Sequence, residues 1–206
     1  MKSHKELDEQ LEILSQIKDK EFTYEVDHMN FKEDYLTGEG EYDFSIVSIR
    51  TKSNWLDLSK IKDDPKFVKD NDDMIKVFGN FATKNNYKFP EKIIKDMSLD
   101  AYDNVIKKLK FHFNRPRPKE LAKDYGIKLN DVELKSMKTP AYPSGHSAQS
   151  RFIAKYLNDL NNTNRFTALG ENISDSRNVA KAHYKSDSEF GKQIGDELYK
   201  HVKKET

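Results

Sequence analysis

Apolar residues recur at helical spacing through much of this chain of 206 residues. The first such pattern predicts an amphipathic helix over residues 4–19, because its apolar positions are separated by charged ones. These positions are Leu7, Leu11, Leu14 and Ile17. Residues 22–60 have no comparable period, and we expect mostly loops with short turns there.

The same spacing predicts a series of helices over the rest of the chain. Their expected ranges are 72–84, a helix opened by Pro90, and then 99–113, 119–124, 146–160, 165–182 and 186–203. Ser98 is a candidate N-cap for the helix over 99–113. Pro116 should end that helix near Asn114, because the residue before a proline is pushed out of the helical region. Ser186 and Glu189 form a capping-box pattern at the start of the last helix.

We expect one all-α domain over residues 1–206, folded as a single-domain helical bundle. A chain of this length can bury a substantial core, and it contains no repeat and no low-complexity linker. Residues 1–65 form an irregular N-terminal part with one amphipathic helix. Residues 66–206 form the helical core and carry all the chemistry discussed below.

Composition excludes several classes of function. The 36 basic and 35 acidic residues nearly cancel, which argues against a general nucleic-acid or membrane-surface role. No apolar run is long enough to suggest a membrane span, and the N-terminus has no apolar signal-peptide core. There is no cysteine, so thiolate chemistry is excluded. We expect a soluble chain, cytoplasmic unless an export signal has been removed.

The first candidate element is a pair of cations seven positions apart. Lys108 and Arg115 can project from one face of a helix near its C-terminal end. Pro116 and Pro118 fix the chain where the arginine is held, and a guanidinium matches phosphate oxygens in two-point contact. A solvated basic face would have the same composition.

The second element is the turn Pro143-Ser144-Gly145-His146, which leads directly into a helix. Glycine allows an anion to approach the backbone, and the free N–H groups of a helix start favour negative charge. Ser144 adds a hydroxyl donor. An ordinary turn with a serine cap is the alternative.

The third element is the run from Ser176 to Asp187. Arg177 and His183 lie six positions apart, and Asp187 follows His183 by four. A carboxylate there can accept the Nδ1 proton of the imidazole and leave Nε2 as a nucleophile. Asp187 could instead only complement the dipole of the last helix.

Taken in order, the three elements resemble a known signature. The combination Lys-x6-Arg-Pro, Pro-Ser-Gly-His and Ser-Arg-x5-His-x3-Asp is similar to that of the type 2 phosphatidic acid phosphatase superfamily. This superfamily includes soluble class A bacterial acid phosphatases, membrane lipid phosphatases and vanadium haloperoxidases. The resemblance covers residues 108–187 and implies the all-helical bundle of that acid phosphatase and haloperoxidase type. Residues 1–65 show no recognisable match.

The resemblance implies a metal-independent phosphomonoesterase of the acid phosphatase type. His183 would be the nucleophile that becomes a phosphohistidine, Asp187 would orient it, and His146 would be the general acid and base. The groups expected to hold the phosphate are Lys108, Arg115, Ser144, Gly145 and Arg177. Three cations can take the place of a metal ion, so we expect no cofactor, with vanadate as an inhibitor that mimics phosphate.

Three other functions remain open. A metal site could use His146, His183 and Asp187, although the surrounding cations would repel the ion. A vanadium-dependent haloperoxidase would use the same pocket, and a non-catalytic phosphate-binding protein would need neither histidine. The expected partner is a small phosphate ester, with no nucleic acid and no membrane span. The soluble relatives make a homodimer plausible.

Overall fold

The computed structural model describes residues 61–124 and 136–205, the single residues 58, 129, 132 and 134, and four short strands nearer the N-terminus. The amphipathic helix predicted over residues 4–19 lies outside the described residues. The strands are β1 Thr23–Tyr24, β2 Met29–Phe31, β3 Tyr42–Phe44 and β4 Ile49–Arg50. β1 pairs with β4 and β2 with β3, both antiparallel. The prediction of loops was therefore wrong at these positions.

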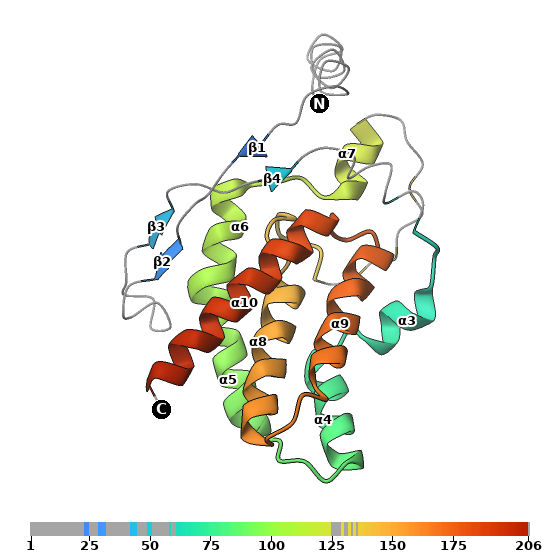
Figure 1. Cartoon of the computed structure of the whole chain (residues 1–206). Coiled ribbons are helices and arrows are strands. Elements are labelled where there is room, and N and C mark those ends of the chain that lie inside the picture. Colours follow the sequence, from blue (N-terminus) through green and yellow to red (C-terminus); the bar gives the residue numbers. More distant parts are fainter. Residues whose placement is uncertain are drawn as a thin grey trace.

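Helices build the rest of the described chain, which confirms the all-α fold class (Figure 1). Their bounds are α3 Pro65–Asp70, α4 Met74–Lys84, α5 Glu91–Ala101, the π-helical turn η1 Tyr102–Ile106, α6 Lys107–Phe113, α7 Pro118–Asp124, α8 Gly145–Leu160, α9 Thr167–Val179 and α10 Lys185–Glu205. None of the described helices is both long and apolar enough to cross a membrane. The division of the chain at residue 65 stays a prediction.

Helix α8 lies at the centre of the helical body. It packs against α9 and α10, and also against α5 and η1, so its apolar positions are covered from several sides (Figure 1). One core cluster joins α5, η1, α6, α8 and α10, and comprises Ala101, Val105, Ile106, Leu109, Ala148, Phe152, Ile194 and Leu198. A second joins α4, α5, α8 and α9, and comprises Met74, Phe78, Ala82, Ile94, Ile153, Ala154, Leu157, Phe166 and Ile173. Burial of these side chains is the main stabilisation that positions α8.

Two glycines let α10 approach the backbone of α8. A Cβ at Gly195 would lie 2.4 Å from the carbonyl oxygen of Ala148, and one at Gly191 would lie 2.5 Å from the carbonyl oxygen of Ser144. Backbone atoms of a packed helix cannot move aside at small cost. These positions therefore fix how close the N-terminal parts of α8 and α10 lie to each other.

The helix that runs through α5, η1 and α6 is continuous, but it changes its period once. A π-helical turn accommodates one extra residue, so the faces beyond it rotate by about 100° relative to an uninterrupted α-helix. Two α-helical turns counted from the buried Ala101 would bring Lys108 to the inner face. Beyond η1, Leu109 and Lys110 are buried instead, and Lys108 is exposed.

The helix ends agree with the sequence in part. Asn114 is the left-handed C-cap of α6, with a φ of 45°, which confirms the predicted end. Ser98 is not an N-cap, because it lies inside α5, where its hydroxyl accepts a hydrogen bond from the side chain of Gln149. α10 begins at Lys185, so Ser186 lies within its first turn and not at the cap.

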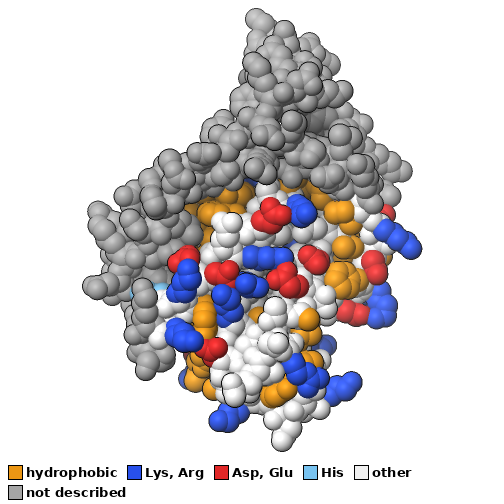
Figure 2. Space-filling model, in the orientation of Figure 1, with side chains coloured by type: hydrophobic (Ala, Val, Ile, Leu, Met, Phe, Trp, Pro, Cys, Tyr) orange, Lys and Arg blue, Asp and Glu red, His pale blue; other side chains and the backbone are white. Residues whose placement is uncertain are grey.

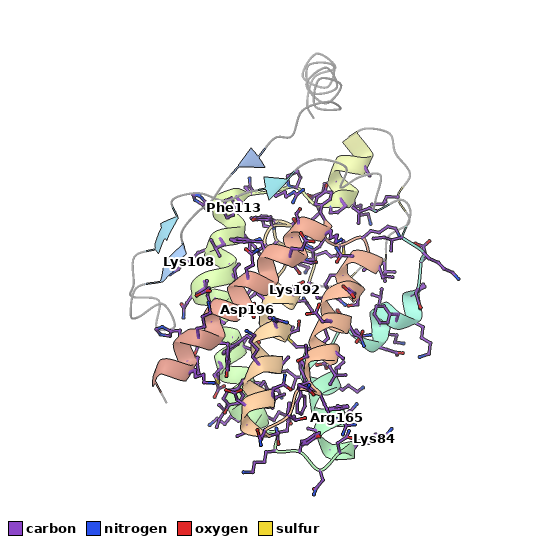
Figure 3. All side chains as sticks on the ribbon, viewed as in Figure 1. Lys84, Lys108, Phe113, Arg165, Lys192 and Asp196 are labelled. Carbon is purple, nitrogen blue, oxygen red and sulfur yellow. The ribbon has the colours of Figure 1, made fainter. Side chains whose placement is uncertain are left out.

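Charged side chains connect α8, α9 and α10 across one face of the protein, where Figure 2 shows blue and red groups side by side. Arg151 of α8 contacts Asp196 of α10 at 2.7 Å and Glu171 of α9 at 3.3 Å. Lys192 also pairs with Glu171 (its position is labelled in Figure 3). Because partly exposed pairs contribute about 0–1 kcal/mol each, they supplement the apolar packing and do not replace it.

Substitution of Gly195 by alanine is expected to destabilise the fold. The added methyl group collides with the Ala148 carbonyl oxygen at 2.4 Å, so α8 and α10 must separate. We expect the free energy of unfolding in urea to fall by about 2 kcal/mol. Gly79→Ala is the control, because its Cβ meets the side chain of Phe89 at 3.1 Å and alanine favours a helix. Equal stability of Gly195→Ala and Gly79→Ala would contradict the close helix contact.

Candidate active site

The buried carboxylate of Asp187 lies in the first turn of α10 and contacts three groups. His183 Nδ1 lies 3.3 Å from Oδ2, and the Tyr184 N–H donates to the same oxygen at 2.9 Å. Arg115 Nη1 donates to Oδ1 at 2.6 Å. His183 stands on the turn between α9 and α10, so the two residues are held on one short segment.

The tautomer of His183 follows from its two neighbours. Arg117 Nη1 lies 3.1 Å from Nε2, and a guanidinium has only hydrogen atoms to offer. Nε2 must therefore accept, and Nδ1 carries the proton that is donated to Asp187. This tautomer has the Nε2 lone pair that a nucleophile requires.

Lys108 is not brought to this site. It is exposed on the outer side of α6 (Figure 3), whereas Lys110, two positions later, is 2% exposed. Arg117, which is 4% exposed, lies beside Nε2 of His183, whereas Arg115, the arginine predicted to hold the phosphate, contacts Asp187. The physical reason is the π-helical turn before α6, which rotates Lys110 inward.

The Lys-x6-Arg-Pro pattern occurs in two overlapping registers, so the sequence also contains the buried pair as a second match. Lys110 and Arg117 are also seven positions apart, and Pro118 follows them as Pro116 follows Arg115. Spacing alone fits both registers equally well. Only burial distinguishes the inner pair from the outer one.

Carbonyl oxygens hold the inner pair of cations. Lys110 Nζ donates to the Pro140 carbonyl at 2.7 Å, Arg117 Nε donates to Thr139 at 2.8 Å, and Arg117 Nη1 donates to Ala182 at 2.8 Å. Among the described side chains, neither Lys110 nor Arg117 pairs with a carboxylate. Both side chains are thus fixed in place without a carboxylate partner from the described part of the chain.

Arg115, unlike Lys110 and Arg117, pairs with a carboxylate of the described residues. Its Nη1 donates to Asp187 and, at 2.9 Å, to the hydroxyl of Ser186, and its guanidinium lies over the ring of Tyr184 at 4.1 Å. It is therefore committed to the carboxylate and lies behind the imidazole.

The turn Pro143–His146 begins α8 beside these residues. The Ser144 side chain caps α8 by accepting from the Ser147 N–H, and the Ser144 N–H donates to the backbone carbonyl of Asp187 at 2.9 Å. The first turn of α8 is consequently joined to the first turn of α10. Gly145 is the first residue of α8, where N–H groups point out of the helix.

Asp72 is a site residue that the sequence did not reveal. It precedes α4 and accepts from Arg177 Nη1 at 2.7 Å. His146 Nε2 lies 3.3 Å from its carbonyl oxygen and 3.9 Å from its Oδ1. Asp72 and Arg177 are 105 positions apart, so no local pattern connects them.

Cations outnumber carboxylates in this cluster. It comprises Lys110, Arg115, Arg117, Arg177, Asp72, Asp187, His146 and His183. Arg177 is 1% exposed, and its Nη2 has no hydrogen-bond partner within the described part of the chain. A buried guanidinium with an unused donor fits an anionic ligand.

Burial and charge shift the proton equilibria in the cluster. Burial, aided by Arg117, lowers the pKa of Lys110 to about 7. Burial also lowers the pKa of His183 to about 3, although the hydrogen bond that Nδ1–H donates to Asp187 acts in the opposite direction. Burial and then Arg177 lower the pKa of His146 to about 4. Burial opposes ionisation of Asp187, but its hydrogen bond with His183 and the charge of Arg115 keep its pKa below the ordinary value. Both histidines are neutral at pH 7.

The alternative metal site is not assembled. Within the described residues, no group of three or more His, Cys, Asp or Glu side chains is arranged to hold a metal ion. His183 Nδ1 faces Asp187 and its Nε2 faces Arg117, while His146 faces Asp72.

A small apolar cluster packs around the chain that leads to His183. It consists of Val68, Ala180 and Ala182, with Val132, Leu134, Met137 and Val179 packed against them. His183, which follows this cluster in the chain, is itself 3% exposed.

No model of a known protein family matches this chain, and no curated protein matches it by sequence.

The pH dependence of stability is expected to report the buried imidazole of His183. The folded pKa of His183, about 3, lies below the value of about 6.5 for an unfolded histidine. Between these pH values the unfolded chain binds more protons, so the free energy of unfolding falls as the pH is lowered. His183→Gln should make that fall shallower in urea titrations at several pH values. His112→Gln, at an exposed position of α6, should leave it unchanged. Identical slopes for His183→Gln and wild type would contradict a buried, neutral imidazole.

Proposed function

We propose that this protein is a metal-independent phosphomonoesterase that acts through a phosphohistidine on His183. One observation carries the proposal. Arg117 lies 3.1 Å from Nε2 of a histidine whose Nδ1–H is held by Asp187, and Lys110 is a second buried basic side chain close enough to lower the pKa of that imidazole; neither has a carboxylate partner in the described residues. Such an arrangement suits a ligand with several negative oxygens around an electrophilic centre. The resemblance to the type 2 phosphatidic acid phosphatase superfamily, in the inner register that begins at Lys110, points to the same ligand.

In the first step, Arg117 Nη1 exchanges its hydrogen bond with Nε2 of His183 for one to a substrate oxygen. The freed Nε2 lone pair attacks phosphorus, and the bond from phosphorus to the ester oxygen breaks. His146 gives a proton to that oxygen, so the alcohol leaves neutral. The imidazole gains positive charge as the P–N bond forms. Asp187, which accepts from Nδ1 at 3.3 Å, stabilises that charge and keeps the ring oriented.

In the second step, His146, now neutral, takes a proton from water as the water attacks phosphorus. The P–N bond breaks, His183 returns to its starting tautomer, and inorganic phosphate is released. Through both steps Lys110, Arg117 and Arg177 offset the charge on the equatorial oxygens, and the Gly145 N–H adds a donor. These groups contact only the phosphate and the bridging oxygen, so the site supports a broad range of small phosphate esters.

The protonation states favour acidic conditions. His146 must be protonated for the first step, and its pKa is about 4 in the unliganded site. A bound phosphate ester adds negative charge nearby and raises that pKa, which extends activity upward in pH. His183 must stay neutral, and its pKa of about 3 permits this in acid.

The two registers of the lysine–arginine pattern make a sharp test. Lys110→Ala removes a buried cation from the phosphate, and we expect kcat/KM for a simple aryl phosphate to fall by about 10²–10³-fold. Lys108→Ala is the matched control on the same helix. Because surface substitutions change free energies by about 0.5 kcal/mol or less, it should alter kcat/KM by no more than about twofold. Circular dichroism verifies that both variants are folded. A larger loss in Lys108→Ala than in Lys110→Ala would assign the phosphate to the outer register.

The covalent intermediate can be trapped directly. Wild-type protein treated with a chelator and mixed with a ³²P-labelled aryl phosphate should carry label on His183 after rapid quenching. In His146→Ala the labelled form should accumulate, because hydrolysis of the intermediate needs a base. His183→Ala should lower turnover by about 10⁴-fold and carry no label.

Two results would contradict this mechanism. Label on a residue other than His183, or substantial turnover by His183→Ala, would remove His183 from the role of nucleophile. Turnover that disappears with the chelator and returns only with added divalent ion would refute metal independence.

A further inference from the structure

Three buried serine hydroxyls form a chain from α9 to the start of α8. Ser174 Oγ lies 2.8 Å from Ser147 Oγ, and Ser147 Oγ lies 2.9 Å from Ser144 Oγ. All three side chains are fully buried. The chain ends at the N-cap of α8, next to the backbone hydrogen bond that joins Ser144 to Asp187.

The number of donors and acceptors at Ser144 decides where its proton goes. A hydroxyl has one proton to donate and two lone pairs that accept. Ser144 Oγ receives the Ser147 N–H at 3.3 Å and faces the Ser147 hydroxyl at 2.9 Å. When Ser147 donates both its N–H and its hydroxyl proton to Ser144 Oγ, both lone pairs of that oxygen are used. The hydroxyl proton of Ser144 must then point elsewhere.

The opposite direction of donation among the three serine hydroxyls is disfavoured. If Ser144 donated to Ser147 and Ser147 to Ser174, the last proton would belong to the fully buried Ser174. Within the described residues, the Ser174 hydroxyl has no partner other than Ser147. A buried hydroxyl proton without an acceptor costs free energy, whereas a phosphate oxygen beside Ser144 would satisfy the forward direction.

We propose that Ser147 and Ser174 are positioning residues that direct the hydroxyl proton of Ser144 toward an oxygen of the bound phosphate group. This inference rests on the proposed function and on the expectation, implied by the family resemblance, that the Ser144 hydroxyl contacts the phosphate. No proton is transferred along the chain. Its effect is that Ser147 fills both acceptor sites of the Ser144 hydroxyl, so that Ser144 can meet a phosphate oxygen only as a donor.

A double-mutant cycle tests the inference with a simple aryl phosphate as substrate. Ser147→Ala should lower kcat/KM by about tenfold and Ser174→Ala by about threefold, the range of one weakened hydrogen bond to a charged group. In a Ser144→Ala background, neither substitution should lower kcat/KM further, because both act through the Ser144 hydroxyl. Ser150→Ala is the matched control. Ser150 is fully buried on the same helix, but its hydroxyl bonds to the Gly170 carbonyl at 3.1 Å, so kcat/KM should stay at the wild-type value.

Binding of inorganic phosphate, measured by calorimetry, separates failure of the inference from failure of the proposed function. Losses that add up in the Ser144→Ala background would overturn the inference while the phosphatase stands. Wild-type protein that binds phosphate without turnover would refute the phosphatase. The same double-mutant cycle, measured through the dissociation constant of phosphate, would then test whether Ser147 and Ser174 act through Ser144. A wild-type protein that binds no phosphate would overturn both.

Discussion

The buried carboxylate of Asp187 is the interaction on which the arrangement of the site depends. A carboxylate taken out of water is very unfavourable unless every oxygen finds a donor. Here the donors are the His183 Nδ1–H, the Tyr184 N–H and the guanidinium of Arg115, while the Asp187 backbone carbonyl accepts from Ser144. The segment that carries His183 and Tyr184 and the segment that carries Arg115 must therefore meet before this charge can be buried. The backbone bond from Ser144 to Asp187 joins the first turn of α8 to the same place.

The close helix contact and the buried carboxylate support each other. Gly191 and Gly195 let the N-terminal part of α10 reach the backbone of α8, and without that approach Asp187 could not meet Ser144. The requirement at Gly191 and Gly195 is steric, and the requirement at the Asp187 carboxylate is electrostatic. Neither is visible as hydrophobic periodicity, although that periodicity correctly predicted most of the helices and the all-α class.

The limits of sequence reasoning have two physical causes here. The first is the π-helical turn η1, which leaves the apolar pattern intact but rotates everything after it, so that Lys110 replaces Lys108 on the inner face. The second is distance along the chain. His183 and Asp187 are four positions apart and their pairing follows from spacing, whereas Asp72 reaches Arg177 across 105 positions and only the packing of α4 beside α9 brings them together.

The choice of partners for the cations explains why an anion is the expected ligand. Arg115 and Arg177 each hold a carboxylate, but Lys110 and Arg117 are held by backbone carbonyls, which fix their positions without adding a negative charge. A carboxylate there would compete with phosphate for the same donors. Burying these two basic groups without a carboxylate destabilises the unliganded fold, and the same burial lowers the pKa of Lys110 to about 7. A bound anion would remove part of that cost, so ligand binding and folding stability are coupled through the same two side chains.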